Sequence, residues 1–343
     1  WKRCEALGLP RAIAITGLDK ENADFDGTVA ALQDLWGARC EVVTFPADDK
    51  QGVVDALSAQ GGQADEIRAR LTDVAAESSD ALIEKVLNGE TLSADELSGG
   101  LRSSVAQAKF IPIFALMARQ SVGLDELLSG FARLMPSPAD RPAKDAAGHA
   151  VNPAADAPLV AQVWRSINDP FVGQLTLARI WGGTLKEKSE AFNATKEQKE
   201  SVGTVYFLNG KKQETVPEAQ AGDVVALAKL KATGLNDVLC AAGKPVQMAP
   251  IAFPNPVVSF AVAPKNQTDD DKLGPGLHRV AEDDPTIHVQ RNEATHELII
   301  TGMGDVQIDV AMERMKARSK VEVALSTPKV AYKETVTAKG EGH

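Results

Sequence analysis

Arg11-Ala-Ile-Ala-Ile-Thr16 is a short apolar run between Gly8-Leu9-Pro10 and Gly17, a pattern typical of a buried parallel strand. Helical and strand patterns then alternate along the chain, with helices expected at residues 21–36, 64–88, 93–108 and 123–134 and strands at 41–46 and 110–114. Strands that alternate with helices predict an α/β layer with a mainly parallel sheet.

The amino-acid composition of the chain changes after residue 140. Proline and alanine are frequent at residues 141–158, which predicts a linker. Residues 159–248 contain short β-rich runs separated by turn residues such as Gly182-Gly183 and Asn209-Gly210, a spacing typical of a small β-barrel. We expect this barrel to be closed or nearly closed.

Residues 255–330 form a third module with its own pattern. The elements expected in it are a strand at 257–262, a helix at 271–282, a hairpin at 287–301, a helix at 306–318 and a strand at 321–325. The order β-α-β-β-α-β predicts a ferredoxin-like domain with a four-stranded antiparallel sheet and two helices. The fold class is therefore multidomain: α/β, then β, then α+β.

Composition narrows the function classes. The chain of 343 residues carries 37 Lys and Arg against 47 Asp and Glu, so its net charge of -10 offers no bulk basic field for DNA. Its three cysteines are odd in number and far apart, which favours thiols in the reducing cytosol. The dense apolar run at 110–118 is too short to cross a bilayer, so no membrane span is expected.

Several short motifs, in one order along the chain, resemble elongation factor G, a ribosomal translocase. The motifs that carry the resemblance are Leu134-Met-Pro-Ser-Pro138, Asp169-Pro-Phe-Val-Gly-Gln-Leu175, Gln220-Ala-Gly-Asp-Val224, Phe253-Pro-Asn-Pro-Val257, Glu282-Asp-Asp-Pro285, Thr301-Gly-Met-Gly-Asp305 and Val330-Ala-Tyr-Lys-Glu-Thr-Val336. The resemblance implies a piece of a longer P-loop GTPase-type protein. Residues 1–140 would be the end of the GTPase domain with an inserted helical subdomain, followed by barrel domain II, domain III and, at 331–343, the start of the connection to a fourth domain.

The resemblance also implies a function and its partners. The intact protein would bind GTP or GDP with Mg²⁺ and act as a monomer on the ribosome, contacting ribosomal RNA and ribosomal proteins, in the cytoplasm. The phosphate-cradling loop, the switch segments and the histidine-bearing segment for GTP hydrolysis are expected outside these 343 residues. We therefore name no catalytic residue, and we expect this chain alone to be inactive and to hold no cofactor.

Two loops are the candidate nucleotide-binding residues. The family's Asn-Lys-x-Asp motif, which reads the guanine edge and covers the ring with the lysine stem, aligns with Thr16-Gly17-Leu18-Asp19. Asp19 keeps the carboxylate, whereas Thr16 offers only a hydroxyl and Gly17 offers no stem. The family's Ser-Ala loop, a backbone N–H donor to the base, aligns with Met117-Ala118. A plain strand-to-helix turn, with Gly17 at positive φ and Asp19 near a helix start, explains the first loop equally well.

Outside these loops the sequence offers weaker candidates. Arg179 and Lys186, on the first hairpin of the barrel, could meet ribosomal RNA phosphates. Asp305, Asp309 and Glu313 share one helix face, but no His or Cys joins them, so we interpret them as a solvated stripe and expect no metal site.

Two functional hypotheses remain. The first is a ribosome-dependent GTPase of the translocase type. The second is a ribosome-binding paralogue whose degenerate nucleotide site makes it a regulator, which the altered first loop favours.

Overall fold

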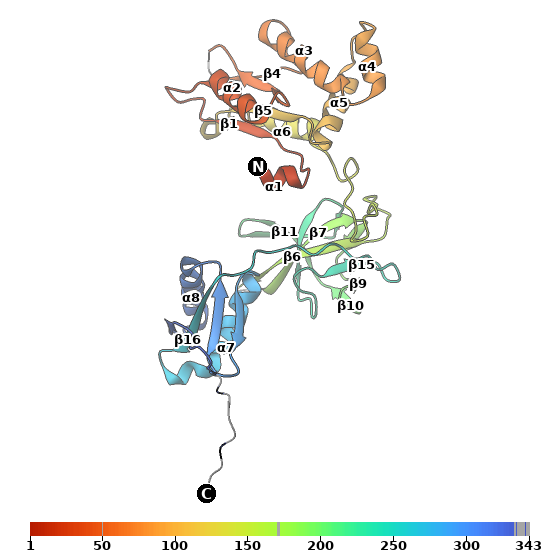
Figure 1. Cartoon of the computed structure of the whole chain (residues 1–343). Helices are drawn as coiled ribbons and strands as arrows, with labels where there is room; N and C mark the ends of the chain where they lie inside the picture. The colour runs from red at the N-terminus through yellow and green to blue at the C-terminus, as the bar shows by residue number, and fades with distance from the viewer. Residues whose placement is uncertain (50, 170–171, 333, 335–339, 341–343) are drawn as a thin grey trace. The chain divides into compact units, whose positions relative to one another are not determined.

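The computed structural model describes residues 1–49, 51–169, 172–332, 334 and 340, and its chain divides into two compact units, 1–142 and 143–343 (Figure 1). Most of the expected connection at 331–343 lies outside the described residues. None of the described helices is both long and apolar enough to cross a membrane.

The first unit is built on a parallel sheet, as predicted. Its strands are β1 (Ile13–Thr16), β5 (Ile111–Leu116) and β2 (Cys40–Val42), in the order β1-β5-β2. All residues of β5 are buried, which explains its continuous apolar run. The α/β layer predicted from the alternating pattern is thereby confirmed.

The strand expected at residues 41–46 is divided in the structure. After β2 the chain turns at Val43 into β3 (Thr44–Pro46), which pairs antiparallel with β4 (Val53–Asp55) outside the parallel sheet. The break is stable because Val43 N–H donates to the Ile113 carbonyl at 2.8 Å and the Val43 carbonyl accepts from Ala56 N–H at 3.0 Å. No backbone polar group of Val43 is left unpaired, and local sequence could not show this.

Six α-helices accompany the sheets in the described part of this unit. They are α1 (Lys2–Ala6), α2 (Phe25–Trp36), α3 (Gly62–Ala76), α4 (Asp80–Leu87), α5 (Ala94–Ala106) and α6 (Leu124–Leu134). A capping box of Ser93 and Glu96 starts α5, where a helix was expected at 93–108. The helix expected at 64–88 is two helices, because Ser79 caps a new start by accepting from Leu82 N–H.

A stack of aromatic rings ties α1 to the rest of the first unit. The rings of Trp1 and Trp36 lie 3.8 Å apart and almost parallel, and the Arg11 guanidinium lies 4.3 Å from the Trp1 ring on a side chain that is 9% exposed. Glu5 contacts both Arg39 and Arg11. These contacts explain how a helix of five residues is held in place, since such a short helix is not stable in isolation.

The second unit begins with a curled half-barrel. Its strands are β6 (Val160–Asp169), β7 (Gly173–Gly182), β8 (Thr184–Lys186), β9 (Ser189–Asn193), β10 (Gln198–Val202), β11 (Val205–Asn209), β12 (Lys212–Val216), β13 (Glu218–Gln220), β14 (Val224–Ala228) and β15 (Val238–Cys240). Eight of them form one sheet in the order β10-β9-β15-β6-β7-β14-β11-β12, and β13 pairs with β8. Residues 143–151, within the linker expected from sequence, pack on this half-barrel through Val151.

A buried carboxylate fastens the β10 edge of the half-barrel. Glu200 is 3% exposed and accepts from the N–H groups of Lys231 and Ala232, at 3.0 and 3.1 Å, and from the Thr233 hydroxyl at 2.8 Å. Burial by itself would raise the pKa of Glu200, but these hydrogen bonds outweigh it and hold the pKa below its ordinary value. The chain segment after β14 is thus attached to β10 by a side chain and not by strand pairing.

A ferredoxin-like domain ends the second unit and confirms the predicted element order. Its elements are β16 (Val258–Pro264), α7 (Asp270–Asp283), β17 (His288–Arg291), β18 (Leu298–Gly302), α8 (Asp305–Ser319) and β19 (Val323–Ser326). The four strands form an antiparallel sheet in the order β17-β18-β16-β19. Buried side chains of α7 and α8, such as Leu277 and Ile308, form the core with Val262 and Ile300.

We predict that Glu200→Gln loosens the β10 edge, because a charged acceptor of three hydrogen bonds is replaced by a neutral amide, at a cost of about 1–3 kcal/mol. Since the folded pKa of Glu200 is depressed, its contribution to stability is present above about pH 4.3, the unfolded value, and is lost as pH falls through the folded pKa. Hydrogen exchange of peptides covering 198–202 and 229–234 measures this at pH 7 and pH 4.

Glu190→Gln is the matched control, since Glu190 is exposed on the neighbouring strand β9. Equal exchange in the two variants at pH 7 would contradict the assigned role of Glu200.

Candidate nucleotide-binding edge of the sheet

The structure places both predicted nucleotide loops at one edge of the parallel sheet. β1 and β5 are neighbours, and Thr16 lies opposite Leu116 in their register. The loops that follow these strands, 16–19 and 117–118, therefore leave the sheet side by side at its carboxyl end. That end is where open α/β sheets bind their ligands.

The first loop is a tight turn. Gly17 has φ +77°, and its carbonyl accepts from Lys20 N–H at 3.1 Å. Leu18 is 7% exposed and anchors the turn in the core, whereas Asp19 is exposed to solvent. The positive φ of Gly17 agrees with the turn interpretation. The helix start does not, because α2 begins at Phe25 with Asp24, and not Asp19, as its N-cap.

Lys20 also belongs to this loop, although no motif in the sequence marks it. A Cβ atom built on Gly17 would lie 3.6 Å from Lys20 Cε and 3.7 Å from Lys20 Cδ. The alkyl stem of Lys20 therefore lies over the position where Gly17 lacks a side chain. The only local signal was the spacing, because a lysine three residues after a turn glycine can fold back over it.

The second loop offers one backbone donor and not two. Met117 is 1% exposed, and its N–H is already donated to the Val122 carbonyl at 3.0 Å. Ala118 is exposed and opens a short 3-10 helix, Ala118–Gln120, whose first N–H groups have no acceptor inside the helix. Of the two residues predicted here, Ala118 is thus the one placed to donate to a ligand.

A cavity of about 380 Å³ adjoins the first loop. Leu18, Asp24, Asp26 and Asp48 are among the residues that line it. Three carboxylates repel an anion, so this cavity does not suit the phosphates of a nucleotide.

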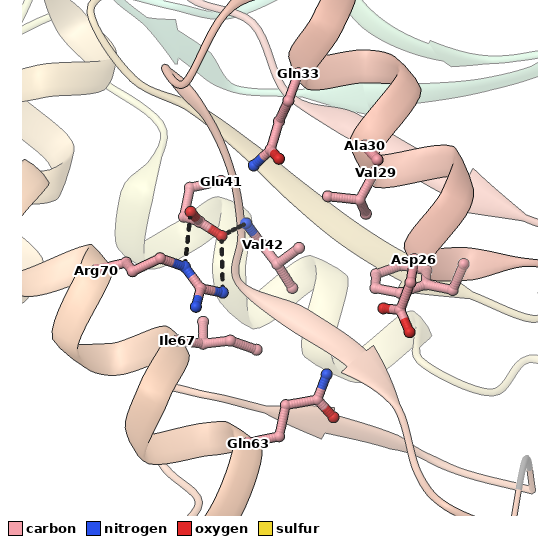
Figure 2. A pocket seen from close by; sticks show the side chains of 10 residues that line it. Asp26, Val29, Ala30, Gln33, Glu41, Val42, Gln63, Ile67 and Arg70 are labelled. Atoms are coloured by element: carbon pink, nitrogen blue, oxygen red, sulfur yellow. Dashed lines mark hydrogen bonds and ion pairs between the residues drawn. The ribbon is translucent and has the colours of Figure 1, made fainter.

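A second cavity, of about 310 Å³, lies between α2 and α3 beside β2 (Figure 2). Glu41 is 7% exposed and accepts from Val42 N–H at 2.9 Å and from Arg70 Nε and Nη2 at 3.0 and 3.3 Å. Figure 2 shows Gln33 and Asp26 on α2, and Gln63 on α3, the helix that also carries Arg70. The carboxylate is fully engaged in joining α3 to β2, so the contacts indicate a structural ion pair.

The two candidate ribosome-binding residues in the second unit, Arg179 and Lys186, differ in their contacts. The Arg179 guanidinium lies 4.9 Å from the Trp181 ring, and its Nε is buried. Lys186 is 66% exposed, with its Nζ 3.8 Å from Glu218. Lys186 thus extends into solvent beside Glu218, whereas Arg179 is held against the half-barrel.

The acidic stripe of α8 is exposed in the structure. Asp305, Asp309 and Glu313 all face solvent. Within the described residues, no group of three or more His, Cys, Asp or Glu side chains could hold a metal ion.

The fold and the order of its domains match known proteins. Residues 158–242 match the family model of elongation factor G domain 2, and residues 253–327 match that of Elongation Factor G, domain III. These two domains of the chain are elongation factor G-like. A crystal structure of a Thermus thermophilus protein resembles it with a TM-score of 0.80 and 27% identity, over 96% of this chain and 51% of that chain. This elongation factor G-like chain therefore spans about half the length of that protein.

We predict that Gly123→Ala displaces the second loop. Gly123 has φ +80°, and an added Cβ would lie 2.7 Å from the Ala115 carbonyl oxygen and 2.9 Å from Val53 Cγ2. Backbone strain costs about 1–2 kcal/mol, and crowding adds about 1–3 kcal/mol. Urea unfolding, followed by hydrogen exchange of peptides covering 110–134, measures the loss.

Gly89→Ala provides the control, since Gly89 has φ +76°, close to that of Gly123, but no atom within 4 Å of an added Cβ. The losses in the free energy of unfolding of the two variants should differ only by the contribution of crowding. Equal losses would show that the contact with Ala115 does not hold the loop.

Proposed function

We propose that this chain is part of a ribosome-dependent translation factor of the translocase type that binds GTP with Mg²⁺. The observation that carries the proposal is the succession of elongation factor G domain 2 and domain III after an α/β unit. Domain 2 and domain III together indicate a translation factor more specifically than any single fold would, because folds are reused for many functions.

The residues at the edge of the sheet fit the base of a guanine nucleotide in part. The exposed Asp19 carboxylate would accept hydrogen bonds from the base, Ala118 N–H would donate to it, and Thr16 would offer a hydroxyl at the remaining position. Lys20 would cover the ring with its stem from the Gly17 side. A bound GTP with Mg²⁺ would supply the charge that orders switch segments in GTPases.

A second candidate function is a ribosome-binding paralogue that regulates translation without efficient GTP turnover. The observation that favours it is the first loop, where Thr16 and Gly17 replace an amide and a lysine, and Met117 N–H is consumed inside the protein. Both candidates place the protein on the ribosome in the cytoplasm as a monomer. They differ in whether guanine nucleotides bind tightly.

The first prediction from this proposal is that the full-length protein co-sediments with purified ribosomes and that binding weakens as salt is raised from about 50 to about 200 mM. Loss of binding at higher salt is expected because contacts to RNA phosphates release counterions. Replacing Lys186 by Glu should weaken binding modestly, whereas Arg179→Gln should change it less, because Arg179 already lies against Trp181. A full-length protein that stays in the supernatant at low salt would contradict both candidate functions.

The second prediction concerns guanine selectivity. Thr16→Asn with Gly17→Lys should tighten GDP binding by about tenfold in the full-length protein, since one added hydrogen bond to a desolvated group contributes about 1–2 kcal/mol. The left-handed φ of Gly17 and the nearby Lys20 stem oppose the new side chain, so the variant also carries Lys20→Ala.

Calorimetry with GDP and ADP measures this change, and Lys20→Ala alone is the control. Residues 1–343 by themselves should bind GTP only weakly, because the two loops hold one end of the nucleotide. Unchanged GDP affinity in the triple variant, or micromolar binding of GTP by the 343-residue chain, would show that these loops do not read the base as assigned.

A further inference from the structure

Helix α8 carries apolar side chains on two faces. Its inner face, with Ile308, Met312 and Met315, is buried in the core of the ferredoxin-like domain. On another face Val306 is 70% exposed and Val310 is 40% exposed. A surface helix ordinarily has a single apolar stripe, which faces the core. The second stripe of α8 is therefore unexplained by the packing of this domain.

A groove of about 360 Å³ runs beside this second stripe, between the end of α7 and α8. Val280, Ile287, Val306 and Val310 form its apolar lining, and Arg314 lies one helical turn beyond Val310. Two carboxylates also line the groove, and both are engaged: Asp283 is paired with Arg318, and Asp284 accepts from Thr286 and Gln307. Arg314 makes no ion pair with any residue that the structure describes.

Hydrogen bonds hold the groove in shape. Gln307 Oε1 accepts from Met303 N–H at 2.7 Å, and Gln307 Nε2 donates to Asp284 Oδ2 at 2.8 Å and to Thr286 Oγ1 at 2.7 Å. These bonds join the turn before α8, the start of α8 and the loop after α7. A groove fixed in this way loses little conformational entropy when a partner binds.

We propose that the α7–α8 groove is a docking site for a segment of a separate protein that presents bulky apolar side chains next to a carboxylate. The valines gain free energy only when apolar atoms cover them. The guanidinium of Arg314 then favours a carboxylate, which it can bind through two parallel hydrogen bonds. RNA fits less well, because its phosphates would meet Arg314 but would leave the valines uncovered. The inference rests on the proposed function and names the partner as a ribosomal protein.

The test uses the full-length protein and purified ribosomes. Val306→Asp should lower co-sedimentation about tenfold, and Arg314→Glu should lower it by a similar factor. Val306 is exposed and lies in the first turn of α8, where an aspartate is favourable to the helix, so this variant is expected to fold. Its thermal unfolding is measured alongside. Glu313→Gln, an exposed neighbour on α8 outside the groove, should leave co-sedimentation unchanged.

A photo-crosslinking amino acid at position 306, compared with one at position 313, identifies what covers the groove. The expected result is a crosslink from position 306 to a ribosomal protein and none to that protein from position 313. A crosslink only to RNA, only within the chain or to a second copy would overturn the inference, as would unchanged co-sedimentation of folded Val306→Asp. If the unsubstituted protein does not co-sediment at all, the proposed function fails and takes this inference with it.

Discussion

The burial of β5 between β1 and β2 is the constraint on which the first unit depends. Every residue of β5 is buried, and it pairs in parallel on both sides. Because parallel neighbours end at the same edge of a sheet, this pairing decides that the loops after Thr16 and Leu116 leave it together. The position of the candidate nucleotide site is therefore a consequence of strand order. Its affinity for a nucleotide depends on the few side chains at the two loops.

In the half-barrel, buried carboxylates hold the segment between β14 and β15 in place. Asp237 is 4% exposed and accepts from Asn193 Nδ2 at 2.9 Å and Gly234 N–H at 2.8 Å, while Lys196 Nζ lies 3.0 Å from it. Glu200 holds the preceding residues of the same segment. Buried carboxylates are stable only when they are hydrogen-bonded, and here backbone N–H groups and side chains share the donors. The segment between β14 and β15 is thus held in place by side-chain hydrogen bonds and not by strand pairing.

In the ferredoxin-like domain, by contrast, buried hydrogen bonds hold an exposed apolar surface in shape. Gln307 is saturated by three hydrogen bonds, and the residues on either side of it, Val306 and Ile308, point to solvent and to the core respectively. One helix thus completes a core and presents a second face. The exposed second face is the surface that we propose as a docking site.

The alternation of strands and helices in the first unit, the element order of the ferredoxin-like domain and the family resemblance were determined by the sequence alone. The alternating runs, the Ser93–Glu96 capping box and the β-α-β-β-α-β order depend on neighbouring residues, so local pattern was sufficient. Tertiary structure decided what the candidate residues can do. Met117 N–H is consumed by Val122, Arg179 is held against Trp181, and β2 is divided from β3 because Val43 pairs with Ile113 and Ala56. Glu200 reaches Lys231, 31 residues later. These contacts join segments far apart in the chain, and no periodicity within either segment encodes the partner that the fold brings to it.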